Sequence, residues 1–364
     1  MERISQSQMA ALIIVFQIGS SPLYLLGKEA GTDAWISILI ALVLGLLLLM
    51  LILLIHRLEP DKDLVEISNA YFGKTIGYVI GAVYFVYFVY QSVRNVRELG
   101  DLVSLYFLQT TPLWIVISML LLIAGYAVWH GLEVFSRITQ ILAPIILLIY
   151  VGFFILVYTL GFIDLHRIEP VLENGLPKVI DAAFGVVSFP FGEMVLFLMF
   201  WKFVAPQKKV FPTTVLWYMV TGLFISLMNL IIIASLGPIS EMSITPFIEL
   251  MSQVRIESYL ERLDPFVGAV FFAGVFIKMT AYFLGAVLVG KRMVKSGQRY
   301  IVVSIGVLLL IASLLFRSYM QHIRIGFSFD VKYHFPIYQF YIPLVLLLVM
   351  LIRRSMRAKK NGRS

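Results

Sequence analysis

Cysteine is absent from this chain of 364 residues, and charged residues make up only 14% of it. Without cysteine, the protein can form neither a disulfide nor a thiolate metal site, and it has no cysteine nucleophile. Histidine is scarce, and the sequence contains no P-loop, no His-Glu-x-x-His motif and no Gly-x-Ser-x-Gly motif. We therefore expect no enzyme activity, no bound metal and no cofactor.

Hydrophobic side chains, in contrast, make up 60% of the sequence, and its mean hydropathy is +0.92. A soluble domain does not tolerate this composition, so we predict an all-α protein that crosses the lipid bilayer many times. The formal net charge of +8 would also suit a nucleic-acid-binding protein. However, the basic residues flank the apolar stretches, as signals of membrane orientation do, so we expect no nucleic-acid partner.

Apolar stretches of roughly 20 residues, the length that crosses a bilayer as a helix, recur along the whole chain. We predict about ten of them in one transmembrane domain over residues 1–364. The predicted spans are 8–28, 34–55, 78–107, 113–130, 138–161, 176–203, 212–236, 262–289, 300–317 and 335–352. Since five crossings invert whatever follows, 8–161 and 176–352 are expected to form inverted halves, followed by a basic tail over 353–364.

The distribution of positive charge predicts how the chain is oriented. With the N-terminus in the cytoplasm, the larger share of the 29 Lys and Arg residues falls on the cytoplasmic side, so both termini are expected there. On this side, residues 58–74 combine mixed charge with helical periodicity, which suits either an interfacial helix or a solvated loop. On the other side, residues 243–264 are amphipathic and acidic and are expected to lie across the outer face.

Two of the predicted spans contain residues that interrupt a helix. In the sixth span, Pro190 lacks an N–H, Gly192 lets the backbone unwind, and Glu193 places a carboxylate at membrane depth. The first span is interrupted near Gly19 and Pro22, at the matching position of the first half. Interrupted helices at matching positions indicate a transporter-type binding site. A packing kink, with the carboxylate neutral or paired, is the alternative.

We therefore predict a ligand site that is built mainly from these two interruptions. The predicted ligand-binding residues there are Gly19, Ser20, Ser21, Ser188, Phe189, Pro190, Gly192 and Glu193. Freed N–H groups suit a carboxylate, and freed carbonyls suit an ammonium group.

The third span is unusually polar in its second half. Gln91 falls near its middle and is the predicted ligand contact of this helix. Arg94 and Glu98, like Arg97 and Asp101, are four residues apart and can pair on one helix face. We expect these four charged residues to be structural and to face either the bundle interior or a water-filled vestibule.

Lys278 lies in the middle of the eighth span and has no charged neighbour within that span. An ammonium group at this depth needs a carboxylate or must lose its proton. Glu193 on the sixth span is the obvious partner. We include Lys278 in the predicted ligand site, and a purely structural role is the alternative.

Several short motifs occur in a fixed order along nearly the whole chain. They are Ile4-Ser5-x-x-Gln8, Thr111-Pro112, Gly131-Leu-Glu133 with Arg137, Glu169-Pro-Val-Leu-Glu-Asn-Gly175, Phe189-Pro-Phe-Gly-Glu193 and Glu261-Arg-Leu-Asp264. This ordered set resembles the B subunit of spore germinant receptors from endospore-forming bacteria, the spore germination permease family. That family belongs with the amino acid/polyamine/organocation transporters. The resemblance implies the five-plus-five inverted-repeat fold of LeuT-like carriers, with helices one and six broken.

The resemblance also implies a function, namely nutrient sensing. In the family, the B subunit lies in the spore inner membrane with a membrane A subunit and a lipoprotein C subunit. It binds a small nutrient, typically an amino acid, and the complex triggers germination. A secondary amino acid transporter on the same scaffold is the alternative, and a membrane subunit with a vestigial pocket is a third. In LeuT-like carriers the eighth helix lies near a sodium site, so the fixed charge of Lys278 argues against sodium coupling.

Overall fold

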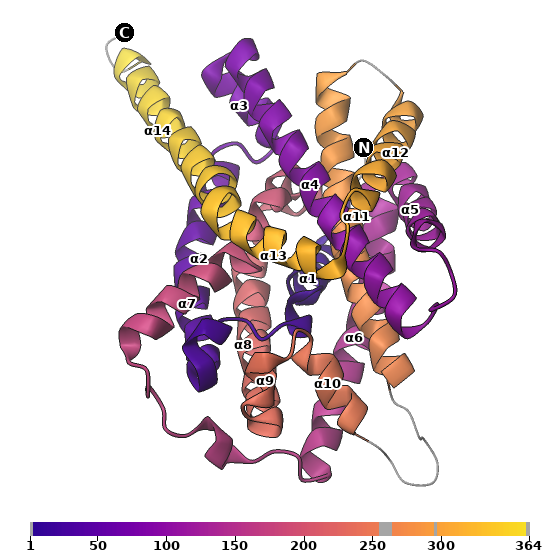
Figure 1. Ribbon diagram of the computed structural model, residues 1–364. Helices are drawn as coiled ribbons and strands as arrows, with labels where there is room; N and C mark the ends of the chain where they lie inside the picture. The colour runs from indigo at the N-terminus through magenta and orange to yellow at the C-terminus, as the bar shows by residue number, and fades with distance from the viewer. Residues whose placement is uncertain (1–2, 255–263, 295–296, 362–364) are drawn as a thin grey trace.

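The computed structural model describes residues 3–254, 264–294 and 297–361, and these residues are mostly helical (Figure 1). The long segments are α1 (Gln6–Ile18), α2 (Ala34–Leu58), α4 (Lys74–Tyr106), α5 (Leu113–Trp129), α6 (Gly131–Thr159), α7 (Leu176–Ser188), α8 (Val210–Leu236), α11 (Asp264–Met293), α12 (Gln298–Leu314) and α14 (Ile342–Asn361). The shorter α-helices are α3 (Leu64–Phe72), α9 (Ile239–Met242), α10 (Pro246–Gln253) and α13 (Tyr319–Phe329).

The remaining elements are short connections or tighter and wider helices. The 3₁₀ helices are η1 (Ser21–Leu23), η2 (Lys28–Asp33), η3 (Leu165–Ile168), η4 (Phe191–Met199), η5 (Trp201–Phe203) and η6 (Gln207–Lys209), and η7 (Asp330–Tyr341) is a π-helix. Strands β1 (Ile4–Ser5) and β2 (Val204–Ala205) pair in parallel. The predicted motif over 261–264 lies outside the described residues except for Asp264.

Each predicted span contains a helix in the part that the structure describes, but the helices differ in length and some end before the predicted span does. Among the described residues, seven helices are long and apolar enough to cross a membrane, and an eighth counts if α12 and α13, which are bent by 107°, form one span. This count is lower than the predicted ten because α1 has only 13 residues and α5 only 17. An integral membrane protein is thus supported, while the count of ten crossings stays a prediction.

Two segments occupy the centre of the bundle. In α1, every residue from Gln8 to Ile18 is buried, and all nine residues of η4 are buried as well. α1 packs against α6, α8 and α11, whereas η4 packs against α2 and α7. The outer helices instead expose apolar side chains such as Leu122 and Leu148. This arrangement suits a protein that is surrounded by lipid and keeps its polar groups inside.

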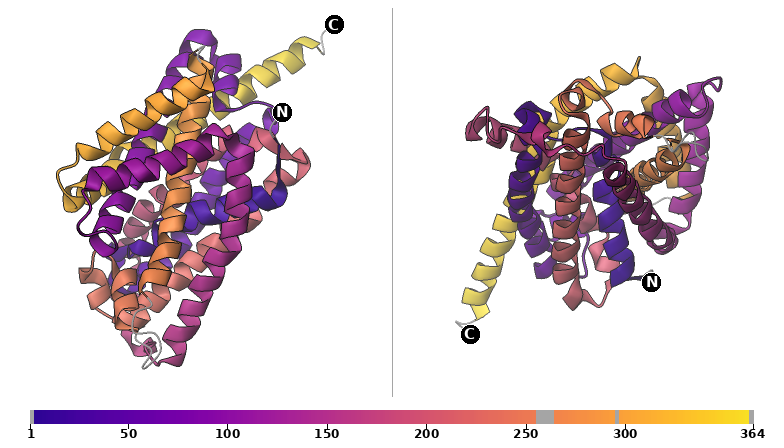
Figure 2. Two further views of the ribbon diagram at one scale, coloured as in Figure 1. Left: turned by 90° about the vertical axis from the view of Figure 1, so that its right-hand side faces the viewer. Right: turned by 90° about the horizontal axis from the view of Figure 1, so that it is seen from below.

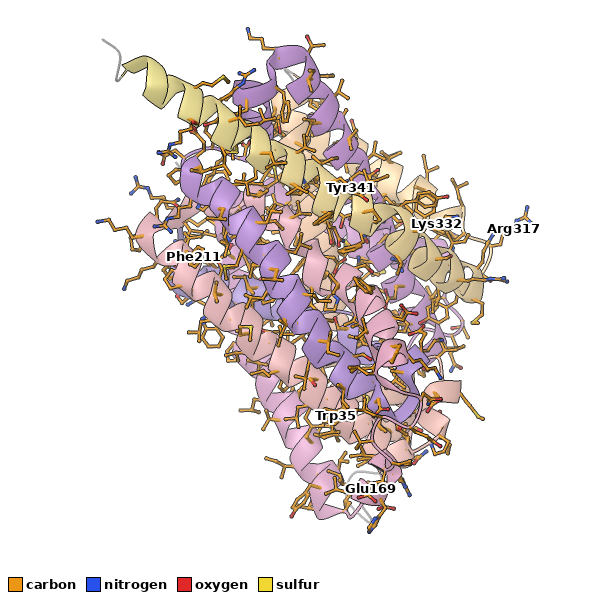
Figure 3. The ribbon with its side chains drawn as sticks, turned by 90° about the vertical axis from the view of Figure 1, so that its left-hand side faces the viewer. Trp35, Glu169, Phe211, Arg317, Lys332 and Tyr341 are labelled. Atoms are coloured by element: carbon orange, nitrogen blue, oxygen red, sulfur yellow. The ribbon has the colours of Figure 1, made fainter. Side chains whose placement is uncertain are left out.

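The C-terminal region contains two further helical elements. The stretch between the ninth and tenth predicted spans is helical, as α13 and the first part of η7. Exposed Arg317 and Lys332 mark one edge of this region, and Tyr341 ends η7 where α14 begins (Figure 3). The basic tail continues α14 as far as Asn361, and this helix end projects away from the bundle in both views of Figure 2.

Helix α3 confirms that 58–74 contains a helix rather than only a solvated loop. Asp63 caps it: the Glu66 N–H donates to the Asp63 carboxylate at 2.9 Å, and the Asp63 N–H donates to Glu66 at 2.9 Å. Lys202 of η5 contacts these two carboxylates at 2.5 and 2.9 Å, and Arg292 of α11 contacts them at 3.1 and 2.8 Å. This four-residue cluster, which we call the α3 clamp, joins three segments that are far apart in sequence.

The α3 clamp generates a prediction about stability and pH. Burial raises the pKa of Asp63, but Lys202, the Glu66 N–H and Arg292 outweigh it and hold that pKa below its usual 3.8. A carboxyl group with a lowered pKa adds stability above its unfolded pKa, and this stability is lost as the pH falls through the folded pKa. In thermal unfolding in detergent, Asp63→Asn should therefore destabilise the protein by about 2 kcal/mol at pH 7, and this effect should fade only as the pH falls below 3.8 and through the folded pKa.

The exposed pair between Glu133 and Arg137 provides the control, because it has the same charges at 2.6 Å but open access to solvent. Glu133→Gln should change the unfolding temperature little. Equal effects of the two substitutions would show that the α3 clamp adds nothing beyond an ordinary surface ion pair.

Candidate ligand site at two helix interruptions

Helix α1 ends at Ile18, well before the end of the predicted span 8–28. The Gly19 N–H donates to the Val15 carbonyl at 2.8 Å as the helix stops, and the Ser21 hydroxyl donates to the Gln17 carbonyl at 2.6 Å. Residues 19–33, all of them described, contain the 3₁₀ turns η1 and η2 but no second α-helical half. The expected broken helix is therefore one short helix and a turn, because Pro22 lacks an N–H and Ser21 caps a freed carbonyl instead.

The sixth predicted span is interrupted at Pro190. Helix α7 ends at Ser188, Phe189 is extended, with φ −147° and ψ 117°, and the chain resumes after Pro190 as the 3₁₀ helix η4. Gly192 does not have a positive φ, so its role is not the backbone freedom that the sequence suggested. A Cβ at this position would instead overlap the side-chain oxygen of Gln339, so the glycine provides space.

A buried ion pair lies beside this interruption. Lys278 Nζ is 2.5 Å from Glu193 Oε2, and both side chains are almost completely buried. The Tyr282 hydroxyl donates to Glu193 Oε1 at 2.8 Å, and the Lys278 ammonium lies 4.2 Å from the centre of the Phe189 ring. The partner predicted for Lys278 is therefore the one that the structure provides. A cation over an aromatic face gains further electrostatic stabilisation where water is excluded.

Two glycines allow α11 to approach the end of α1 closely. A Cβ on Gly274 would lie 3.3 Å from the Gly19 carbonyl oxygen, and a Cβ on Gly19 would lie 3.0 Å from Lys278 Cδ. Larger residues at either position would push the two segments apart. This close approach brings the Lys278 side chain across the end of α1 and towards Glu193.

A small enclosed cavity lies between the two interruptions and α4. It is lined by Ser20, Tyr24, Gln91, Arg94, Asn95, Glu98, Phe189 and Glu193. Its volume is about 10 Å³, which is enough for about one water molecule. A ligand larger than water would therefore require the walls of this cavity to separate.

The structure brings together four of the predicted ligand-binding residues on the cavity wall: Ser20, Gln91, Phe189 and Glu193. The others are adjacent in sequence or, like Lys278, bonded to a wall residue, but they do not line the cavity: Gly19, Ser21, Ser188, Pro190, Gly192 and Lys278. These six residues are therefore neighbours of the cavity rather than part of its surface.

The polar stripe of α4 divides into two parts. Arg97 donates to Asp101 at 2.7 Å and to the carbonyls of Ser313 and Phe316 at 3.0 and 2.7 Å, so this pair joins α4 to the end of α12. The other two charged residues of the stripe, Arg94 and Glu98, line the cavity instead. Two of the four residues that were expected to be structural, Arg94 and Glu98, are therefore candidate ligand contacts.

Two residues that line the cavity, Asn95 and Tyr24, were not predicted from the sequence. Asn95 lies four residues after Gln91 and hence on the same helix face, a spacing that could have revealed it. Tyr24 donates its hydroxyl to Glu98 at 3.0 Å, a contact across 74 residues that no local pattern indicates. Within the described part of the chain, no group of three or more His, Asp or Glu side chains could hold a metal ion.

The chain matches a family model described as spore germination protein over residues 3–320. It belongs to the spore germination protein family. It is 29% identical over 366 residues to spore germination protein KB of Bacillus subtilis (strain 168), covering 99% of this chain and 98% of that protein. It is also 26% identical to spore germination protein B2 of the same organism, over 71% of this chain and 70% of that one. The predicted membership of the B-subunit family is therefore confirmed.

The fold of this chain is similar to a solved structure. That structure is Mhp1, a nucleobase-cation-symport-1 family transporter in a closed conformation with bromovinylhydantoin bound. The TM-score is 0.59 at 12% identity, over 91% of this chain and 76% of that chain. This likeness confirms an all-α, LeuT-like transporter fold. The division into the inverted halves 8–161 and 176–352 stays a prediction.

The buried pair between Lys278 and Glu193 generates a second prediction. Lys278→Met leaves the carboxylate buried without its ammonium partner, so it should lower stability by about 3–5 kcal/mol. The double variant Lys278→Met/Glu193→Gln removes both charges and should recover much of that loss. Protein abundance in membranes and thermal unfolding in detergent measure both effects. A single variant as stable as the native protein would mean that the two charges do not depend on each other.

Proposed function

We propose that this protein is the nutrient-sensing membrane subunit of a spore germinant receptor. It binds a small germinant, an amino acid, between the end of α1 and the interruption at Pro190, and it signals to partner subunits to start germination. Family membership and the transporter fold support this proposal. The observation that carries it is the buried cavity at the two interruptions, whose wall bears charges of both signs. The family is one of permease-like membrane proteins, so we propose no catalytic step.

The charges on the cavity wall suit a zwitterion. Arg94 is the natural partner of a ligand carboxylate, because a guanidinium group can bind it with two parallel hydrogen bonds. Glu98 and Gln91 offer oxygen atoms for a ligand ammonium group. Glu193 is already engaged by Lys278 and Tyr282, so it contributes mainly to the shape and field of the site.

The closed cavity also supports a mechanism of signalling. An amino acid is much larger than the water-sized space present, so it must bind to a form in which the α1 end and the Pro190 interruption have moved apart from α4. Ligand binding shifts the balance between the two forms only by its differential affinity for them. In a receptor, partner subunits detect this shift.

We infer that the partners are the germinant receptor A subunit and the lipoprotein C subunit, in the spore inner membrane. The relatives named as spore germination proteins support this placement. The excess of Lys and Arg on one side supports a cytoplasmic position for both termini. The lipid bilayer is then the direct surroundings of the exposed apolar side chains.

A secondary amino acid transporter is the second candidate function, and the likeness to the transporter Mhp1 favours it. A transporter would complete the cycle and release the ligand on the inner side. Uptake of amino acids by proteoliposomes that contain this chain alone would support transport, whereas loss of germination without uptake would support sensing.

The first test is the germination of spores that lack this gene, on a panel of amino acids, sugars and nucleosides. We expect the response to one nutrient class to be lost, and restoring the gene to recover it. Germination can be followed by the fall in optical density. Unchanged germination across the panel, in a strain without related receptor genes, would contradict the receptor function.

The second test addresses the cavity wall. Glu98→Gln removes the carboxylate charge but keeps an oxygen that can accept the Tyr24 hydroxyl. A hydrogen bond to a charged group contributes about 1.5–3 kcal/mol, so the germinant concentration for half-maximal response should rise roughly 10- to 100-fold.

Asp101→Asn is the matched control, because it removes a carboxylate from the same helix that pairs with Arg97 away from the cavity. It should leave the half-maximal concentration unchanged. If both substitutions shift this concentration equally, Glu98 has no special contact with the germinant.

A further inference from the structure

The π-helix η7 lies beside the interruption at Pro190. It packs against α7, η4 and α4, and it continues into α14 (Figure 1). π-helical turns are rare and occur frequently at functional sites. Pro336 lies within η7 and removes one backbone N–H from its hydrogen-bonding pattern. This element therefore connects the candidate ligand site to the last helix of the chain.

One side chain of η7 reaches the interruption itself. Gln339 is 1% exposed, and its Nε2 donates to the Ser188 carbonyl at 3.1 Å. In a continuous helix this carbonyl would accept from the N–H four residues later, but Pro190 interrupts that pattern. Because a carbonyl without a donor is costly at membrane depth, Gln339 supplies the hydrogen bond that the broken helix lacks.

The same amide group also contacts α4, the helix that carries several of the cavity residues. Gln339 Nε2 donates to the Tyr87 hydroxyl on α4 at 3.0 Å. Tyr87 lies one helical turn before Gln91, which lines the cavity. The Tyr87 ring stacks on Tyr338 with a centroid distance of 4.7 Å and an interplanar angle of 13°. η7 is thus attached to α4 by a ring contact as well as by the amide.

Gly192 provides the space for this bridge. A Cβ at Gly192 would overlap Gln339 Oε1 and would lie 2.9 Å from Gln339 Cδ. The first turn of η4 and the Gln339 side chain therefore fit together only while position 192 has no side chain. The glycine in the interrupted span and the glutamine near the C-terminus depend on each other.

We propose that Gln339 is a positioning residue that bridges the two segments that flank the ligand site, the end of α7 at Ser188 and α4 at Tyr87. Through this bridge, separation of the Pro190 interruption from α4 is transmitted to η7 and α14. The proposal rests on the proposed function, since it describes how occupancy of the same site reaches the end of the chain.

The first test is the germination response of spores with Gln339→Met, which keeps the length of the side chain but removes the donor. A merely structural defect lowers the amount of receptor and hence the maximal rate. A positioning defect also moves the midpoint, so we expect the half-maximal germinant concentration to change at least tenfold in either direction at comparable abundance. Gln321→Met, an exposed glutamine on α13, is the control and should leave the midpoint unchanged.

A second test does not depend on a germinant. In the purified full-length protein, Gly192→Ala should lower the unfolding temperature because its methyl group meets Gln339, and Gln339→Ala should recover part of that loss in the double variant. A native midpoint in Gln339→Met spores, or no recovery in the double variant, would overturn the proposal. If deletion of the gene leaves germination unchanged, the proposed function fails, and the recovery test alone decides whether Gln339 fills the space beside Gly192.

Discussion

The bilayer interior offers no water to a charge or to a freed backbone carbonyl, and the pair between Glu193 and Lys278 is where this constraint is most severe. Each of these groups would be costly alone, so each requires the other at 2.5 Å. Their contact specifies where α11 lies against the end of α1 and against the start of η4. The close approach at Gly19 and Gly274, and the ring of Phe189 over the ammonium group, follow from this position.

The other polar groups of the core obey the same constraint by joining distant segments. Arg97 attaches α4 to the end of α12, Gln339 attaches η7 to the end of α7, and the α3 clamp attaches η5 to α11 on the predicted cytoplasmic side. None of the residues that make these contacts lines the cavity, whose wall includes Arg94 and Glu98. Under the proposed function, these contacts hold the scaffold, whereas Arg94 and Glu98 on the cavity wall are the residues that would contact a ligand.

A sensor and a transporter make the same demands on the ligand site but different demands on the rest of the molecule. A transporter must alternate between openings to the two sides of the membrane, whereas a sensor needs only two states that its partners distinguish. The long connection from the interruption through η7 to the projecting end of α14 suits a sensor. It leads from the buried cavity to the exposed residues 351–356 of α14.

Composition and local spacing alone were enough to predict the membrane class, the approximate course of most helices, the interruption at Pro190 and the need of Lys278 for a carboxylate. These features depend on composition and local spacing, and hydropathy, proline and isolated charge express them directly. Three features became visible only in the folded chain: Arg94 and Glu98 line the cavity, Tyr24 joins them there, and Gln339 donates to the Ser188 carbonyl at the end of α7. Those contacts connect residues 74 to 151 positions apart, and no local pattern specifies which side chains meet across the bundle.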